Sequence, residues 1–322
     1  LSMSGIICLT PLLSRFLRFA LVPIWNFFGL DAGLLAGILA IDMGGYQLAG
    51  ELSASQEMVR YAGLVIAATL GCTITFTIPV GMGMLKSGDR LLFSRGMLIG
   101  TGTLPVTMIV GGLLSGLSFL QIVLQSLPVL LFCFLLMFGI WRFPEQTVRA
   151  FTVFADVIRF LTTIGLIAGA FCYMTGFSLL PDLAPLEDAM AVVSSIGIVL
   201  LGSLPTAELL QRVLKKPLSF IGRKTGMNDS SAAGLLMGIV SPVPAITMME
   251  KMDERGKIVN AAFLVSAAST IAAHMGFTFG TDPDFVVPLL VAKLAGGIAA
   301  VCAALFSRRN LLNCLRAYIA TQ

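Results

Sequence analysis

The chain has 322 residues, of which 57% are apolar and 12% are charged, and its mean hydropathy is +0.94. This composition excludes an ordinary soluble domain, in which about a quarter of the residues are charged. The single histidine and the six scattered cysteines form no motif with metal-ligand or redox spacing, so we expect no metal, no cofactor and no disulfide framework. Basic cytoplasmic loops explain the net charge of +4, which therefore does not predict nucleic-acid binding.

Apolar stretches recur along the chain, and most of them reach the length of a bilayer crossing, about 20 residues. In chain order they cover residues 1–13, 33–50, 58–84, 91–117, 119–141, 148–175, 189–210, 230–249, 258–280 and 285–306. The sequence therefore predicts a polytopic membrane protein in contact with the lipid bilayer. The chain opens inside an apolar stretch without a methionine, so we expect further residues upstream, and no cleavable signal peptide is recognisable.

Two apolar stretches are interrupted by residues that a continuous helix tolerates poorly. Asp42-Met43-Gly44-Gly45 interrupts one stretch, and Ser241-Pro242-Val243-Pro244 interrupts the other. Paired glycines loosen a helix, and proline removes a backbone donor and clashes with the preceding turn. Backbone freed in this way at membrane depth is tolerated only where it is buried in protein or lines a cavity. We therefore predict two broken helices, with the solute site beside the breaks.

The two interruptions fall at corresponding positions when the chain is compared with itself. The pairs superposed by shifts of 193 to 197 residues are Gly44-Gly45 with Ser241-Pro242, Thr73-Ile74 with Thr270-Ile271, and Asp89 with Asp282. We predict an internal duplication from this spacing. Few identities are involved, so chance is the competing interpretation.

Lysine and arginine positions predict how the interrupted stretches lie, because basic loops stay cytoplasmic. Basic residues flank the second stretch on both sides, within residues 212–224 and 251–257. A single crossing would separate these two groups, so the second stretch is predicted to enter and leave from the cytoplasm as a re-entrant hairpin. For the first stretch the charges do not decide, and only the duplication predicts re-entry, from the outside; a spanning segment is the alternative.

The predicted fold is therefore an all-α polytopic membrane protein with inverted structural repeats, each carrying a broken or re-entrant helical hairpin. The predicted segments are a first repeat 1–118 with its hairpin at about 31–52, a linking span 119–147, a second repeat 148–306 with its hairpin at about 228–250, and an amphipathic cytoplasmic tail 307–322. Inverted repeats with broken helices are the architecture of many secondary transporters.

Several separated motifs resemble the ethanolamine permease family of bacterial ethanolamine-utilisation operons. These motifs are Ile41-Asp42-Met43-Gly44-Gly45-Tyr46, Thr77-Ile78-Pro79-Val80, Met252–Asn260, Val265-Ser266-Ala267-Ala268 and His274-Met275-Gly276-Phe277. The resemblance covers nearly the whole chain. It implies an inner-membrane carrier that delivers ethanolamine to the enzymes that degrade it, commonly inside a protein-shelled microcompartment. The chain departs from the family at the second hairpin tip, where Ser241-Pro242 stands in place of two asparagines.

Asp42 is the leading candidate for contact with the substrate. An aspartate at mid-membrane costs about 2.5–3.5 kcal/mol on insertion scales and is a functional-site hypothesis by default. The ammonium and the hydroxyl of protonated ethanolamine both donate hydrogen bonds. The carboxylate of Asp42 and the free carbonyls of Met43, Gly44 and Gly45 are acceptors that would bind them. The alternatives are that Asp42 caps the following half-helix and that the glycines serve helix packing.

Four further side chains or turns are candidates, each with a structural alternative. Tyr46 and Phe76 could place an aromatic face against the ammonium, or they could be plain core residues. The Thr73 hydroxyl could bind the solute, or it could bond backbone near the Pro79 kink. Ser241, Pro242 and Pro244 would expose carbonyls at the second hairpin tip.

His274 is the only imidazole of the chain and is predicted to lie within a membrane span. It could relay a proton or accept from the substrate hydroxyl; the alternative is a neutral histidine that joins two helices. Lys293, within the last span, is expected to snorkel toward an end or to pair with an acid.

The sequence as a whole predicts a carrier for ethanolamine or a similar small amine that works by alternating access, in the inner membrane, with a cytoplasmic C-terminus. Coupling to H⁺ or Na⁺ and assembly as a homo-oligomer are left open. A channel is the nearest alternative, since glycine-rich hairpins also form filters. A membrane enzyme with Asp42 and His274 as an acid–base pair is the more remote one, because the chain has no nucleophile elbow, metal cluster or phosphate loop.

Overall fold

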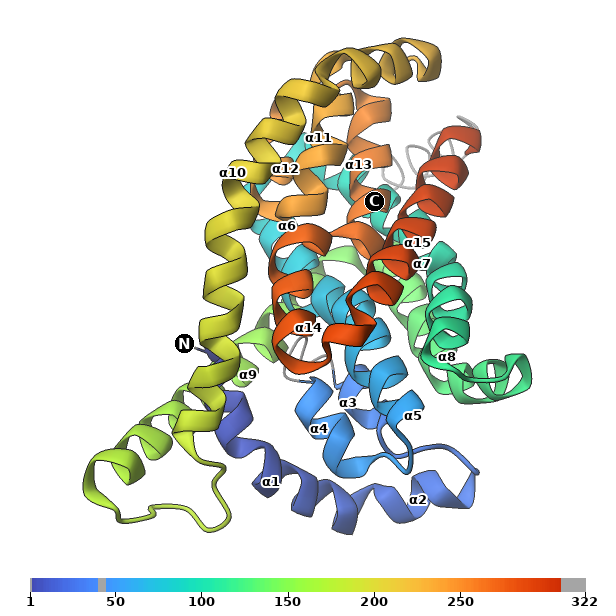
Figure 1. Cartoon of the computed structure of the whole chain (residues 1–322). Helices are drawn as coiled ribbons and strands as arrows, with labels where there is room; N and C mark the ends of the chain where they lie inside the picture. The colour runs from blue at the N-terminus through green and yellow to red at the C-terminus, as the bar shows by residue number, and fades with distance from the viewer. Residues whose placement is uncertain (1, 40–44, 308–322) are drawn as a thin grey trace.

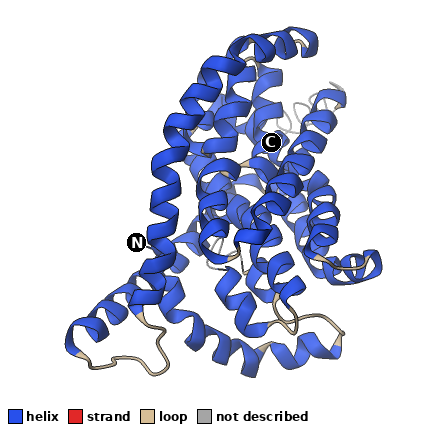
Figure 2. Cartoon of the chain, in the orientation of Figure 1, coloured by secondary structure: helices blue, strands red, loops and turns tan. Residues whose placement is uncertain are grey.

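The computed structural model describes residues 2–39 and 45–307, and over these residues it contains helices and no strand (Figure 2). The α-helices are α1 (Ser2–Ala20), α2 (Val22–Phe27), α3 (Leu34–Ile38), α4 (Gly45–Leu52), α5 (Gln56–Arg60), α6 (Ile78–Met84), α7 (Ser87–Ser115), α8 (Phe119–Arg142), α9 (Pro144–Thr175), α10 (Leu186–Thr225), α11 (Asp229–Val240), α12 (Pro242–Met248), α13 (Glu254–Ala267), α14 (Met275–Thr281) and α15 (Val286–Phe306). The π-helical segments are η2 (Tyr61–Gly71), η3 (Thr73–Thr77) and η5 (Thr270–His274), and the 3₁₀ turns are η4 (Met249–Lys251) and η6 (Pro283–Phe285).

Six helical runs in the described residues are long and apolar enough to cross a membrane. They are Gln56–Met84, Ser87–Ser115, Phe119–Arg142, Pro144–Thr175, Glu254–Thr281 and Pro283–Phe306. The chain is therefore a polytopic membrane protein, as its composition predicts. The remaining apolar stretches form shorter helices, apart from the 40-residue α10, which runs along one edge of the molecule (Figure 1).

The first interrupted stretch forms the short helices α3 and α4, which we call hairpin 1 together with their flanks (residues 31–54). The carboxylate of Asp31 accepts hydrogen bonds from the backbone N–H of Gly33 at 2.7 Å and of Ala54 at 3.1 Å. The two ends of hairpin 1 are therefore held together. Asp42, Met43 and Gly44 lie outside the described residues.

The second interrupted stretch forms α11 and α12, and we call residues 228–253 hairpin 2. The helix breaks at Ser241, whose backbone is extended (φ −156°, ψ 135°), and Pro242 occupies the first turn of α12. This is the break that the prolines predict. Asn228 donates its backbone N–H to Asp253 Oδ1 at 2.9 Å and its side-chain N–H to the Lys251 carbonyl at 2.9 Å, so the ends of hairpin 2 also meet.

The long helix that follows each hairpin is irregular near its middle. In residues 56–84 the backbone is π-helical through η2 and η3, ahead of Pro79, and the Thr75 hydroxyl bonds the Gly71 carbonyl at 2.9 Å. In residues 254–281, Ser269 has φ +55°, a conformation that side chains with a Cβ rarely adopt. Its N–H is donated to the carbonyl of Gly238 in hairpin 2 at 3.0 Å. The break is thus stabilised by a tertiary contact.

The two hairpins lie toward opposite ends of the molecule. Figure 1 shows α3 and α4 in the lower half, near α1, α2 and α5, whereas α11 and α12 lie in the upper half, near α13. Helices α7 and α13 pack closely: a Cβ on Gly96 of α7 would lie 2.4 Å from the Ala261 Cβ of α13. Only glycine permits this approach of α7 to α13.

Candidate functional site

His274 lies in the π-helical segment η5 and is 1% exposed. Its Nδ1 is 3.1 Å from the carbonyl oxygen of Ala268. A carbonyl oxygen only accepts hydrogen bonds, so Nδ1 carries a hydrogen, and in the neutral ring Nε2 would then be the acceptor nitrogen. In that tautomer Nε2 could accept a proton, or a hydrogen bond from the hydroxyl group of a solute.

The segment around His274 contacts both hairpins. On its N-terminal side, Ala272 packs against Val240, the residue before the break of hairpin 2. On its C-terminal side, the Phe277 ring meets the Tyr46 ring of hairpin 1 edge to face, with centroids 6.2 Å apart. His274 is therefore placed along its helix between the contacts to the two hairpins, which brings three of the predicted site elements into one region.

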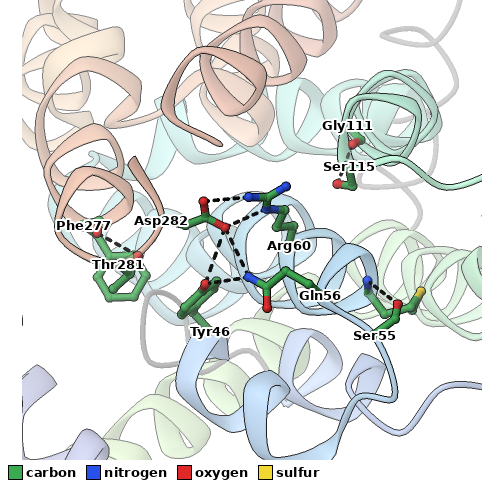
Figure 3. Close-up of polar contacts among 10 residues, drawn as sticks. Tyr46, Ser55, Gln56, Arg60, Gly111, Ser115, Phe277, Thr281 and Asp282 are labelled. Carbon is green, nitrogen blue, oxygen red and sulfur yellow. Dashed lines mark hydrogen bonds and ion pairs between the residues drawn. The ribbon is translucent and has the colours of Figure 1, made fainter. Parts of the chain in front are cut away.

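Tyr46 belongs to a polar cluster that we call the Asp282 cluster: Tyr46, Gln56, Arg60 and Asp282 (Figure 3). Arg60 donates two hydrogen bonds to the Asp282 carboxylate: Nε lies 2.7 Å from Oδ2, and Nη2 lies 3.0 Å from Oδ1. Gln56 Nε2 donates to Asp282 Oδ2 at 3.3 Å and to Tyr46 Oη at 3.1 Å, and Tyr46 Oη lies 3.5 Å from Oδ2. Asp282 is only 7% exposed.

Of the four residues in the Asp282 cluster, only Tyr46 is a candidate site residue in the sequence analysis. In the sequence, Arg60 and Asp282 lie 222 positions apart and have the pattern of ordinary charged residues in two outer loops. The one signal in the sequence that draws attention to Asp282 is the predicted duplication, which superposes it on Asp89.

The start of α13 carries a second group of charges. Lys257 Nζ lies 2.6 Å from Asp89 Oδ1 on the first turn of α7. Asp253 caps α13 by accepting from the Gly256 N–H, and it also accepts from the Ser231 hydroxyl at 2.7 Å. Burial raises the pKa of Asp253, but these hydrogen bonds and that from the Asn228 N–H together lower the pKa below its ordinary value.

Of the three threonines of η3, Thr73 and Thr75 have hydrogen-bonded hydroxyls and Thr77 does not. Thr73 is 1% exposed and donates to the Val265 carbonyl of α13 at 3.1 Å, so its hydroxyl joins two distant helices. The Thr77 hydroxyl is fully buried and has no hydrogen-bond partner among the described residues. Thr75 already bonds the backbone near the Pro79 kink. A buried hydroxyl without a partner is costly, and a bound solute could supply one.

Lys293 does not show one of its two expected arrangements. It is 0% exposed, so it does not snorkel to an end of the span, and its Nζ donates to the carbonyl of Ala68 in η2 at 2.7 Å. The low dielectric around it makes such a charge-assisted bond strong.

The other predicted residues are less enclosed or serve packing. Phe76 is 38% exposed, which does not favour a closed cation pocket around its ring. Gly45 is buried at the start of α4, against η2. Pro242 is buried, while Ser241 and Pro244 are half-buried.

Two cavities of the described part of the chain lie elsewhere. One of about 320 Å³ is lined by residues of the α9–α10 connection, and one of about 450 Å³ lies at the start of α13 beside Arg95 and Arg255. Neither is lined by a predicted binding residue. No group of three metal-binding side chains occurs among the residues that the structure describes.

Comparison with known proteins agrees with the motifs. The family described as "Ethanolamine utilisation protein, EutH" matches residues 1–307. The chain is 38% identical to the probable ethanolamine permease EutH of Listeria monocytogenes, over 97% of this chain and 84% of that protein. It is 34% identical to the protein of the same name in Escherichia coli, over 94% and 80% of the two chains, and 33% identical to the uncharacterized protein YxeR of Bacillus subtilis, over 94% and 82%. No solved structure matches. This chain belongs to the EutH family of ethanolamine utilisation proteins.

Proposed function

We propose that this protein is a permease that carries ethanolamine across a membrane. The observation that carries this conclusion is its membership of the EutH family, whose relatives in Listeria and Escherichia bear the name of probable ethanolamine permeases. The six apolar helices give the multi-pass body that such a carrier needs. It is a transporter and not an enzyme.

The proposed mechanism is alternating access between two inverted repeats. An offset of 197 residues relates η3 (Thr73–Thr77) to η5 (Thr270–His274), α6 (Ile78–Met84) to α14 (Met275–Thr281), and the start of α4 at Gly45 to the start of α12 at Pro242. The hairpins lie toward opposite ends of the molecule (Figure 1). Both observations support a duplication in which each hairpin enters the membrane from its own side.

The proposed substrate site lies between the hairpin tips. The Asp42 carboxylate and the carbonyls of Met43 and Gly44 would bind the ammonium, and neutral His274 would accept from the hydroxyl at Nε2. The unpartnered hydroxyl of Thr77, which the 197-residue offset relates to His274, supports a polar solute on the opposite side of the same site. Hairpin 2 would contribute backbone carbonyls at Ser241, Pro242 and Pro244.

The proposed location is the inner membrane, with the basic start of α13 and the C-terminus in the cytoplasm. Cysteines introduced as Lys216→Cys and Glu254→Cys, before and after hairpin 2, should both resist an impermeant thiol reagent added from outside. Ser178→Cys, in the loop between α9 and α10, is the matched position that should react. Reaction of either of the first two cysteines would contradict re-entry of hairpin 2.

Uptake of labelled ethanolamine into liposomes that contain the purified protein tests the function. We expect saturable uptake and counterflow, in which unlabelled ethanolamine inside accelerates entry of label. Flux that rises linearly with concentration and shows no counterflow would indicate the channel instead.

A further inference from the structure

An ion pair at one end of the molecule joins the two halves of the chain. Arg60, at the junction of α5 and η2, pairs with Asp282, which ends α14. The contact uses two guanidinium nitrogens and both carboxylate oxygens, and the Arg60 guanidinium also lies 5.6 Å from the centre of the Phe285 ring. The Asp282 side chain is 7% exposed and that of Arg60 is 28% exposed. Such a bidentate, sheltered pair is stronger than a surface contact.

A second ion pair joins the same two halves at the start of α13. Lys257, on the first turn of α13, lies 2.6 Å from Asp89, on the first turn of α7. The Lys257 side chain is 13% exposed and that of Asp89 is 20% exposed, so this pair is sheltered as well. Since α13 and α14 belong to the run Glu254–Thr281, Lys257 lies on the first turn of one span-length run and Asp282 directly follows its last residue, so the two pairs lie at opposite ends of that run.

The two pairs are reciprocal. Arg60 and Lys257 are 197 positions apart, and Asp89 and Asp282 are 193 positions apart, the same shifts that relate the two copies of the duplication. The basic residue of each half therefore pairs with the acidic residue of the other half. If the two ion pairs between the halves had arisen independently, we would not expect their residues to be related by the shifts that superpose one half of the chain on the other.

Each pair is also connected to the hairpin of its own end. Tyr46 of hairpin 1 reaches the Asp282 carboxylate and receives a hydrogen bond from Gln56. At the other end, Glu250 of hairpin 2 pairs with Lys86, three residues before Asp89. Movement of a hairpin would therefore strain the ion pair at its end.

We propose that Arg60–Asp282 and Lys257–Asp89 are the two gates of the transport cycle, each of which holds one end of the substrate path closed. Both pairs are formed in this structure. In the proposed cycle, the state with both pairs formed is the one in which neither end is open. Transport requires each gate to break in turn, because both cannot be open at once in a carrier. This inference rests on the proposed function and names the residues that alternate.

Accessibility of Cys72 tests the gates. Cys72 lies between η2 and η3 and is 4% exposed. In a protein whose other cysteines are replaced by alanine, Arg60→Gln should let an impermeant thiol reagent reach Cys72 about tenfold faster from the Arg60 side, as when a minor state of a few per cent becomes a major one. Lys257→Gln should have the same effect from the opposite side. Vesicles of both orientations separate the two directions.

Matched variants separate a gate from a merely structural contact. The charge exchange Arg60→Asp with Asp282→Arg should return labelling to the slow rate of the parent protein. Arg15→Gln, which removes the exposed Arg15–Asp182 pair, should leave labelling unchanged. Asp282→Asn and Asp89→Asn repeat the test if the arginine or lysine variant does not fold. Unchanged labelling in correctly folded gate variants, or labelling of both variants from the same side, would overturn the proposal.

The labelling needs no substrate, so the two proposals can fail separately. If the parent protein does not take up ethanolamine but the labelling is sided as described, the gates stand and the assigned substrate is wrong. If ethanolamine is taken up and the labelling does not change, the permease stands and the gates are wrong.

Discussion

Lys293 donates a hydrogen bond of 2.7 Å to the backbone carbonyl of Ala68, 225 positions earlier in the chain. The bond ties the last described helix to the π-helical segment η2, and its donor is completely buried. A charged donor placed this deep serves the protein only while its partners stay in position.

Lys293→Met should therefore destabilise the protein while keeping the volume of the side chain. Hydrogen bonds to charged groups contribute about 1.5–3 kcal/mol, and the Ala68 carbonyl would lose this donor. Thermal unfolding in detergent would show a lower Tm. Lys251→Met, at an exposed position, is the control and should leave Tm unchanged. An equal Tm for both variants would mean that the Lys293 bond contributes nothing.

Asp42→Asn should abolish saturable ethanolamine uptake and leave the protein folded. The amide keeps the shape of the side chain but removes the charge that would bind the ammonium. Uptake into liposomes measures the effect, and size-exclusion chromatography in detergent checks folding. Michaelis parameters equal to those of the parent protein would remove Asp42 from the site.

His274→Asn should distinguish the role of Nδ1 as a hydrogen-bond donor from the role of Nε2 as an acceptor. The asparagine amide can still donate to the Ala268 carbonyl in the place of Nδ1, but it supplies no acceptor at the position of Nε2. We expect a folded protein that has lost its preference for ethanolamine over ethylamine, which lacks the hydroxyl. The lost bond is worth about 1–3 kcal/mol, roughly 5- to 150-fold in relative uptake. A preserved preference would assign His274 to helix packing alone.

Thr77→Val should impair transport without impairing folding. The Thr77 hydroxyl has no hydrogen-bond partner among the described residues, so its replacement by a methyl group is expected to leave Tm equal or slightly higher. If the solute is its partner, the Michaelis constant for ethanolamine should rise severalfold. Thr75→Val, where the hydroxyl bonds the Gly71 carbonyl, is the comparison and should leave that constant unchanged.

Asp253 makes the base of hairpin 2 sensitive to acid. Its pKa is lowered in the folded protein, so the stability it contributes is present above the unfolded pKa of about 3.9 and is lost as the pH falls below that value. Asp253→Ala should cost about 0.5–2 kcal/mol at pH 7, the usual value of a helix cap. Asp253→Asn keeps the acceptor and should lose less at pH 7, with a smaller decline of Tm below pH 4. A parent protein whose Tm declines as little as that of Asp253→Asn would contradict this role.

The sequence by itself determined the membrane class, the break at Ser241-Pro242 and the long apolar helices, because hydropathy and proline act on the chain locally. It also carried the family motifs and the spacing that predicts a duplication. Tertiary structure decided which polar groups meet: Arg60 with Asp282, Thr73 with a carbonyl 192 positions away, and Lys293 with Ala68. A hydropathy pattern records how much of each helix is buried, but it does not record which face of which distant helix is its neighbour. Such partners are fixed only when the helices pack, and that is why the ion pairs between the halves could not be predicted from their local sequence.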